Sequence, residues 1–121
     1  MLATMEKRIL VLEDDRAILE LMELTLESEG YCVIGINHFE PLEYIIEFGP
    51  DIILLDIRLS DGYGHLLCQD LKANPITTKI PVILVSGADN LETIAKNSRA
   101  NDYLCKPFNA DDLLNLVKEY A

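Results

Sequence analysis

The sequence predicts an α/β domain in which helices cover both faces of a single parallel sheet of five strands. Two observations lead to this fold class. Short apolar runs rich in Ile, Val and Leu alternate with helix-like amphipathic segments along all 121 residues, without a Gly/Ser-rich linker or a low-complexity tract. The apolar runs are also continuous, which is typical of strands buried on both faces of a parallel sheet. A chain of this length suits one compact domain.

Five of the apolar runs are predicted strands. They are "RILVL" (8–12), "YCVIGI" (31–36), "DIILL" (51–55), "PVILVS" (81–86) and "DYLC" (102–105). Parallel strands need crossover connections, which are right-handed and place helices on both faces of the sheet. The predicted architecture is therefore a doubly wound (βα)5 domain over residues 8–121, preceded by an N-terminal extension at residues 1–7.

The first helix lies between the first two strands. Its inward face is predicted from apolar residues three and four positions apart, with Gly30 as the stop signal. These inward residues are Ile18, Leu21, Met22 and Leu26.

Further helices are predicted at residues 41–48, where Pro41 suits a first turn, and at 65–73, which the "NP" dipeptide ends. A shorter helix is predicted at 91–97. The last helix begins after Asn109, a candidate N-cap with Asp112 three positions later. Its predicted inward residues are Leu113, Leu116, Val117 and Tyr120.

Composition narrows the possible partners. The formal net charge is −11 and no basic patch is visible, so we expect neither direct nucleic-acid binding nor binding to an anionic membrane surface. No apolar run approaches the roughly 20 residues that span a bilayer, and "MLATMEKR" does not lead into a signal-peptide h-region, so we expect a cytoplasmic protein. Cys32, Cys68 and Cys105 are too scattered for a zinc site or a disulfide scaffold, and we expect reduced, mostly packed thiols.

Acidic residues end two of the predicted strands. In the flavodoxin-like strand order 2-1-3-4-5, the first and third strands are neighbours, and ligands bind beyond their carboxyl ends. Glu13, Asp14 and Asp56 should therefore converge in one crevice. Two such charges about 5 Å apart repel by roughly 3 kcal/mol at an effective dielectric constant near 20. This cost favours a hard divalent cation, and Mg²⁺ fits best, with Mn²⁺ as a possible substitute.

The same edge receives the ends of the fourth and fifth strands. Ser86 ends the fourth strand, and Lys106 follows the fifth. A hydroxyl, an ammonium group and a metal around one carboxylate are the parts needed to receive a phosphoryl group, because catalysis of this transfer consists mainly of positioning and charge neutralisation. We therefore predict Asp56 to be the nucleophile.

Four segments together resemble the receiver domain of two-component response regulators. They are "ILVLEDD", "PDIILLDIRLSDGYG", "IPVILVSG" and "NDYLCKPF", and the similarity spans nearly the whole chain. The resemblance implies that a histidine kinase or a histidine phosphotransfer protein donates phosphoryl from phosphohistidine to Asp56. It also implies that Glu13 and Asp14 bind Mg²⁺ together with Asp56 and the backbone carbonyl of Arg58. Such a domain is a phosphoprotein switch that catalyses its own phosphorylation and slow dephosphorylation, and it is not a turnover enzyme.

The resemblance extends to the switch itself. It implies that Ser86 holds a phosphoryl oxygen, that Lys106 pairs with the phosphoryl group and that Tyr103 turns inward when Ser86 moves. The output would be a downstream protein or an attached domain that contacts the fourth helix, fifth strand and fifth helix. It also implies a cis bond between Lys106 and Pro107. Arg58 and Ala88 would flank the path of the hydrolytic water, and neither suits orienting it, so we expect a long-lived phosphoryl group.

Some positions depart from the family pattern. Ser60 stands where proline is common, Arg99 stands where glycine commonly precedes the fifth strand, and the interval from Ser86 to Lys106 is short. The last two departures concern the region of the fourth helix, which belongs to the predicted signalling surface.

Four other residues have simpler interpretations. We expect Asp15 to be a helix cap or a solvated neighbour of the metal site, His38 and His65 to have surface or packing roles, and Cys105 to pack in the core.

Three other functions match parts of this pattern. A haloacid-dehalogenase-like phosphatase needs a second acid two residues after the nucleophile, where this chain has Arg58. A flavin carrier is disfavoured because acids replace the phosphate loop after the first strand. A receiver fold that serves as a constitutive docking module is the remaining alternative, and a phosphorylation assay would distinguish it.

Overall fold

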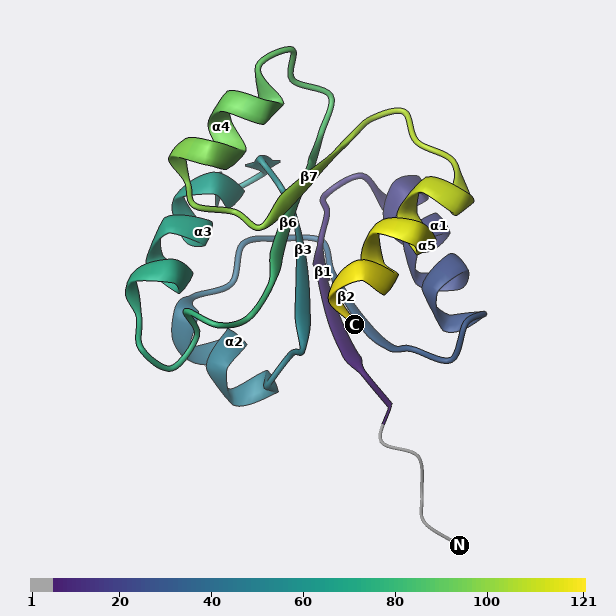
Figure 1. Ribbon diagram of the computed structural model, residues 1–121, viewed down its shortest axis with the longest axis horizontal. Helices are drawn as coiled ribbons and strands as arrows, with labels where there is room; N and C mark the ends of the chain where they lie inside the picture. The colour runs from purple at the N-terminus through teal and green to yellow at the C-terminus, as the bar shows by residue number, and fades with distance from the viewer. Residues whose placement is uncertain (1–5) are drawn as a thin grey trace, which may run out of the picture.

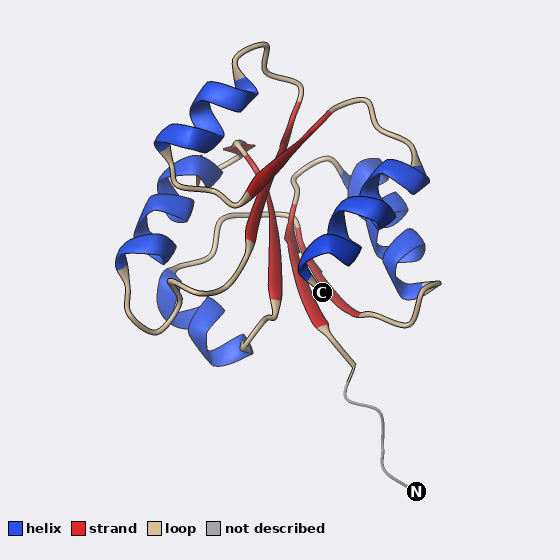
Figure 2. Cartoon of the chain, viewed as in Figure 1, coloured by secondary structure: helices blue, strands red, loops and turns tan. Residues whose placement is uncertain are grey.

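The computed structural model describes residues 6–121 (Figure 1). Within this range a parallel sheet carries helices on both faces (Figure 2). Its strands are β1 (Arg8–Leu12), β2 (Cys32–Ile36), β3 (Ile52–Asp56), β6 (Val82–Ser86) and β7 (Asp102–Cys105). The helices are α1 (Arg16–Glu27), α2 (Leu42–Phe48), α3 (Gly64–Ala73), α4 (Leu91–Asn97) and α5 (Ala110–Tyr120). Residues 1–5 of the predicted extension lie outside the described range, and the division of the chain at residue 8 stays a prediction.

The order of the sheet is β2-β1-β3-β6-β7, and all neighbouring strands are parallel. Counted along the chain, this is the predicted order 2-1-3-4-5. β2 and β3 lie on opposite sides of β1, so the direction in which strands are added across the sheet changes at β1. The carboxyl ends of β1 and β3 therefore meet at the point where a doubly wound sheet is expected to bind ligands.

Alternate residues of the central strands face two separate cores. On one face, Leu10 and Leu12 of β1 pack with residues of α2, α3 and α4. On the other face, Ile9 and Val11 pack with residues of α1 and α5. Figure 1 shows these two helix layers on opposite sides of the sheet. Burial on both faces explains why β1, β3 and β6 are continuously apolar.

The orientation of α1 corrects one prediction. Leu19, Met22 and Leu26 are buried, whereas Leu21 is 47% exposed. The predicted and the observed inward residues both recur at helical spacing. Contact with the sheet decides which of the two faces is buried, and the buried face includes Leu19. Asp15 caps this helix, because its Oδ1 accepts a hydrogen bond from the Ile18 amide at 3.1 Å. The interpretation of Asp15 as a helix cap is confirmed.

The helices α4 and α5 form as predicted. Asn109 and Asp112 make a reciprocal capping box at the start of α5. α4 ends at Asn97, and Arg99 then takes a left-handed conformation with φ of 63°. This is the conformation that glycine supplies after many helices, so Arg99 adopts it at a cost in strain. The bond between Lys106 and Pro107 is cis, as predicted.

The cysteines differ in burial. All three are free; Cys68 is buried and Cys32 is half-buried. Cys105 is exposed, so its predicted packing role was wrong. It is the last residue of β7, which is an edge strand of the sheet. Among residues 6–121, no helix is both long enough and apolar enough to cross a bilayer.

Candidate phosphoacceptor site

Three carboxylates meet at the carboxyl ends of β1 and β3. Glu13 and Asp14 follow β1, and Asp56 is the last residue of β3. Each offers an oxygen, and these oxygens all lie within 4.8 Å of one another. Glu13 and Asp56 are buried, whereas Asp14 is exposed. The sheet therefore brings together the acids that the sequence predicted to converge.

Burial makes Glu13 an unusual acid. Burial raises the pKa of the Glu13 carboxyl to about 7, and the adjacent Asp56 contributes to this rise. The Asp15 amide donates to Glu13 Oε2 at 3.1 Å and opposes the shift. The Glu13 amide donates to the Ile36 carbonyl at 3.0 Å, which fixes the backbone against the end of β2.

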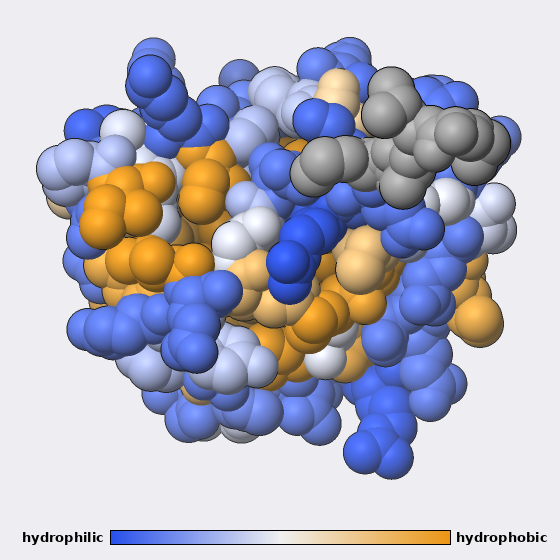
Figure 3. All heavy atoms as spheres, turned by 90° about the horizontal axis from the view of Figure 1, so that it is seen from below, coloured by the Kyte–Doolittle hydropathy of each residue, from blue (hydrophilic) through white to orange (hydrophobic). Residues whose placement is uncertain are grey.

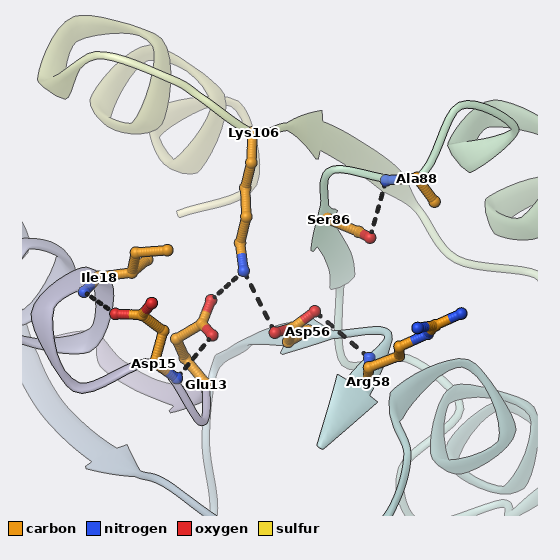
Figure 4. Close-up of polar contacts among 8 residues, drawn as sticks. All are labelled: Glu13, Asp15, Ile18, Asp56, Arg58, Ser86, Ala88 and Lys106. Atoms are coloured by element: carbon orange, nitrogen blue, oxygen red, sulfur yellow. Dashed lines mark hydrogen bonds and ion pairs between the residues drawn. The ribbon is translucent and has the colours of Figure 1, made fainter. Parts of the chain in front are cut away.

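Lys106 neutralises part of this charge. Its Nζ lies 2.6 Å from Glu13 Oε1 and 3.2 Å from Asp56 Oδ2 (Figure 4). Burial lowers the pKa of Lys106, but the contact with Glu13 and the charge of Asp56 outweigh this effect, and the pKa is raised. The side chain is therefore a stable cation that bridges two acids. The Lys106 amide also donates to the Ser86 carbonyl at 2.8 Å, which ties the residue after β7 to the end of β6.

Ser86 and Arg58 lie on the other side of Asp56 from Glu13 (Figure 4). Ser86 is buried, and its Oγ accepts a hydrogen bond from the Ala88 amide at 3.2 Å. The Ser86 hydroxyl hydrogen remains available as a donor, since this bond uses only the oxygen. The Arg58 amide donates to Asp56 Oδ1 at 3.3 Å, while its side chain points away from Asp56.

Tyr103 is the second residue of β7 and is half-buried. It packs against the core cluster on the α4 side of the sheet. The negative charge of Glu92, on α4, is the main cause of a raised pKa at the Tyr103 hydroxyl. Tyr103 therefore packs on the face of the sheet that α4 covers, near Glu92.

The sequence analysis missed a hairpin immediately after Asp56. β4 (Arg58–Leu59) and β5 (Gly62–Tyr63) pair as short antiparallel strands. The turn between them is Ser60–Asp61, and Gly62 is already paired with Leu59, so the "DG" dipeptide does not occupy the turn position at which it signals a hairpin.

Gly64 is a second residue that the sequence analysis missed. Its amide donates to the Ile57 carbonyl at 2.8 Å. A Cβ at this position would lie 2.9 Å from the Asp56 carbonyl carbon and even closer to the carbonyl oxygen. Only glycine lets α3 begin this close to the end of β3, so Gly64 positions the backbone of Asp56.

The donor set suits a small, hard cation. Two buried carboxylates and one exposed carboxylate converge, and a magnesium site commonly uses a few such oxygens and retains several waters. The exposed Asp14 lies on the open side, where such waters have room. The clustered acids therefore fit a divalent metal.

Comparison with known proteins decides the family. A model described as the response regulator receiver domain matches residues 9–118. The chain belongs to this family. Among curated receiver-containing relatives, the transcriptional regulatory protein KdpE of Staphylococcus aureus is 37% identical over 90% of this chain and 47% of its own length. The chain thus spans about half the length of such relatives.

Solved receiver domains have the same fold. A CheY-like response regulator receiver domain protein from Methanospirillum hungatei is 34% identical, with a TM-score of 0.84, over 95% of this chain and 93% of its own. The beryllofluoride-activated receiver domain of DrrB is 27% identical, with a TM-score of 0.80, over 96% of this chain and 97% of its own.

Proposed function

We propose that this receiver domain is a phosphorylation-dependent switch in which Asp56 accepts a phosphoryl group from a phosphohistidine. The histidine belongs to a partner histidine kinase or histidine phosphotransfer protein. The observation that carries the proposal is the position of Asp56, whose two carboxylate oxygens contact the Lys106 ammonium and the Arg58 amide. Its neighbours can neutralise an incoming phosphoryl group without rearranging the sheet.

The residues around Asp56 have separate tasks. Glu13, Asp14 and Asp56 would hold Mg²⁺ or Mn²⁺. The resemblance to receiver domains adds the backbone carbonyl of Arg58 as a further ligand. When bound, such a metal would supply positive charge that balances the negative charge of the phosphoryl group. An Asp56 carboxylate oxygen bonds to phosphorus while the bond from phosphorus to the donor histidine nitrogen breaks. Lys106 pairs with the transferred group, and the Ser86 hydroxyl donates to one of its oxygens.

An apolar groove beside the site supports a helical donor. Ile18 and Leu21 of α1 form one wall, and Pro107 and Phe108 form the other, around a volume of about 330 Å³. Lys106 also lines the groove, so the groove and the phosphoacceptor site share this residue. A helix that presents apolar residues near its phosphohistidine could bury them here while the phosphoryl group reaches Asp56. The exposure of Leu21 is consistent with this role.

The proposed output is a change in the face formed by α4, β7 and α5. Ser86 and Tyr103 link this face to Asp56 and would be the elements that move. A downstream protein or an attached output domain would bind there. We further propose that the domain acts in the cytoplasm and does not itself bind nucleic acid or a membrane.

Arg58 and Ala88 support a long signal lifetime. Ala88 cannot orient a water molecule, and the Arg58 side chain is directed away from Asp56. We expect Arg58→Asn with Ala88→Glu to accelerate loss of the phosphoryl group, measured by mass spectrometry after the donor is removed. An unchanged or slower decay would contradict this assignment, provided that Mg²⁺ binding is retained.

Phosphorylation with a small donor tests the proposal directly. The protein is incubated with acetyl phosphate and Mg²⁺, and the product is analysed by intact mass and peptide mapping. One phosphoryl group should appear on Asp56, and Asp56→Asn should abolish it. Asp51→Asn is a matched control, because Asp51 is exposed just before the opposite end of the same strand. Equal phosphorylation of parent and Asp56→Asn would refute the assignment and would leave a constitutive docking module.

A further inference from the structure

A second groove lies on the other side of the molecule from the α1 groove. It runs between α2 and α3, has a volume of about 570 Å³, and its lining includes Phe39, Leu42 and Leu67. Leu67 is buried at the floor, whereas Pro41 and Pro75 at the rim are exposed. In Figure 3, apolar atoms gather on the left, the side where α2 and the end of α3 lie in Figure 1. The hollow is therefore open to solvent and partly apolar.

The charged residues that line the groove are all acidic. Glu43 projects from α2 and Asp70 from α3, and both are exposed. The strongly negative net charge of the chain adds to their field. Electrostatic complementarity favours a partner with positive charge beside the apolar surface that it buries. A lysine or arginine next to a bulky apolar side chain meets both requirements.

Phe39 connects this groove to the phosphoacceptor site. Its amide donates to Asp61 Oδ1 at 2.8 Å, and its ring lies so close to Gly62 that a Cβ there would be 2.6 Å from Phe39 Cδ2. Asp61 and Gly62 belong to the β4–β5 hairpin, whose first residue, Arg58, donates its amide to Asp56. The hairpin thus contacts the phosphoacceptor at one end and one wall of the groove at the other.

We propose that the α2–α3 groove is a further protein-docking surface, separate from the α1 groove and from the face formed by α4, β7 and α5. Its occupant is a partner segment that inserts a bulky apolar side chain between α2 and α3 and places lysine or arginine against Glu43 and Asp70. The hairpin links docking to the state of Asp56, because a displacement of Arg58 is transmitted through Asp61 to Phe39. This linkage rests on the proposed function, the phosphorylation of Asp56. Docking of the partner segment to the unphosphorylated domain does not depend on it.

Titration of the ¹⁵N-labelled domain followed by NMR tests the proposal. The probe is a short synthetic peptide with a central Phe flanked by lysines, and the comparison peptide carries glutamates instead. The lysine peptide should shift the amides of Leu42, Leu67 and Asp70, and the glutamate peptide should not. The double variant Glu43→Gln with Asp70→Asn should weaken binding by about fivefold. Asp111→Asn with Glu119→Gln on α5 makes the same charge change away from the groove and should leave binding unchanged.

The linkage is tested with the same peptide and beryllofluoride as a phosphoryl mimic. Its affinity should differ between the mimic-bound and free domains, and Asp61→Ala should reduce that difference. Absence of groove shifts, or equal binding of both peptides, would overturn the docking proposal whether or not Asp56 is phosphorylated. Equal affinity in the two states of a domain that does bind beryllofluoride would overturn the linkage.

Discussion

Substitution of Gly64 by alanine should damage both the stability and the chemistry of this domain. The added methyl group would lie 2.9 Å from the Asp56 carbonyl carbon, whereas carbon atoms pack best at roughly 3.5–4.0 Å. Relief requires the start of α3 to move away from β3. That movement would also lengthen the hydrogen bond from the Gly64 amide to the Ile57 carbonyl.

The expected cost has two parts. Overpacking of a well-packed site typically destabilises by about 1–3 kcal/mol, and a lost backbone hydrogen bond adds about 0.5–1.5 kcal/mol. We therefore expect the free energy of unfolding to fall by about 1.5–4.5 kcal/mol, with a decrease in melting temperature of roughly 6–18 °C. Phosphorylation of the folded fraction should also slow, because the displaced backbone carries Asp56.

Urea denaturation followed by circular dichroism measures the first effect, and initial phosphorylation rates below the unfolding transition measure the second. Gly87→Ala is the matched control. Gly87 follows β6 at the same edge of the sheet, and the atoms nearest to an added Cβ there lie 3.9 Å away, in Lys106. A free energy of unfolding for Gly64→Ala within about 0.5 kcal/mol of that of Gly87→Ala would refute the steric argument.

Three further predictions concern other parts of the molecule. Asp14→Ala should abolish Mg²⁺-dependent phosphorylation without unfolding the domain, because Asp14 is exposed and its removal relieves repulsion among the clustered acids; full activity in chelator would contradict this. Tyr120 donates to Asp102 at 2.9 Å, and burial together with this bond raises the pKa of Tyr120 to about 12. The unfolded chain loses this proton near pH 10, so stability should fall between about pH 10 and 12, and a melting series should show a smaller fall for Tyr120→Phe. Arg99→Gly should raise the free energy of unfolding by about 1 kcal/mol by removing left-handed strain, whereas Arg99→Lys should not; equal stability of the two variants would show that the strain is absent.

Local sequence patterns predicted the helices and the main strands. Continuous runs of Ile, Val and Leu indicated doubly buried strands, and the observed bounds of these strands differ from the predicted ones by at most one residue. The capping residues Asp15 and Asn109 begin α1 and α5 through contacts within a single turn. Apolar runs and helix caps can be predicted from the sequence because they depend on residues that are close together in it.

The acids of the site were also predictable, but for a different reason. Glu13, Asp14 and Asp56 end strands that a parallel sheet must align at one edge, so topology alone brings them together. The resemblance to receiver domains added the proposed switch roles of Ser86 and Tyr103, which spacing alone could not supply.

The tertiary structure alone decided which face of α1 is buried, how close α3 approaches β3 and where Cys105 lies. Leu21 fits the helical period as well as Leu19 does, and only the position of the sheet distinguishes them. The requirement for glycine at position 64 arises from the backbone of Asp56, and the exposure of Cys105 arises from the edge position of β7. Periodicity records which residues share a face of one element, whereas these outcomes depend on distances between elements, which no single segment encodes.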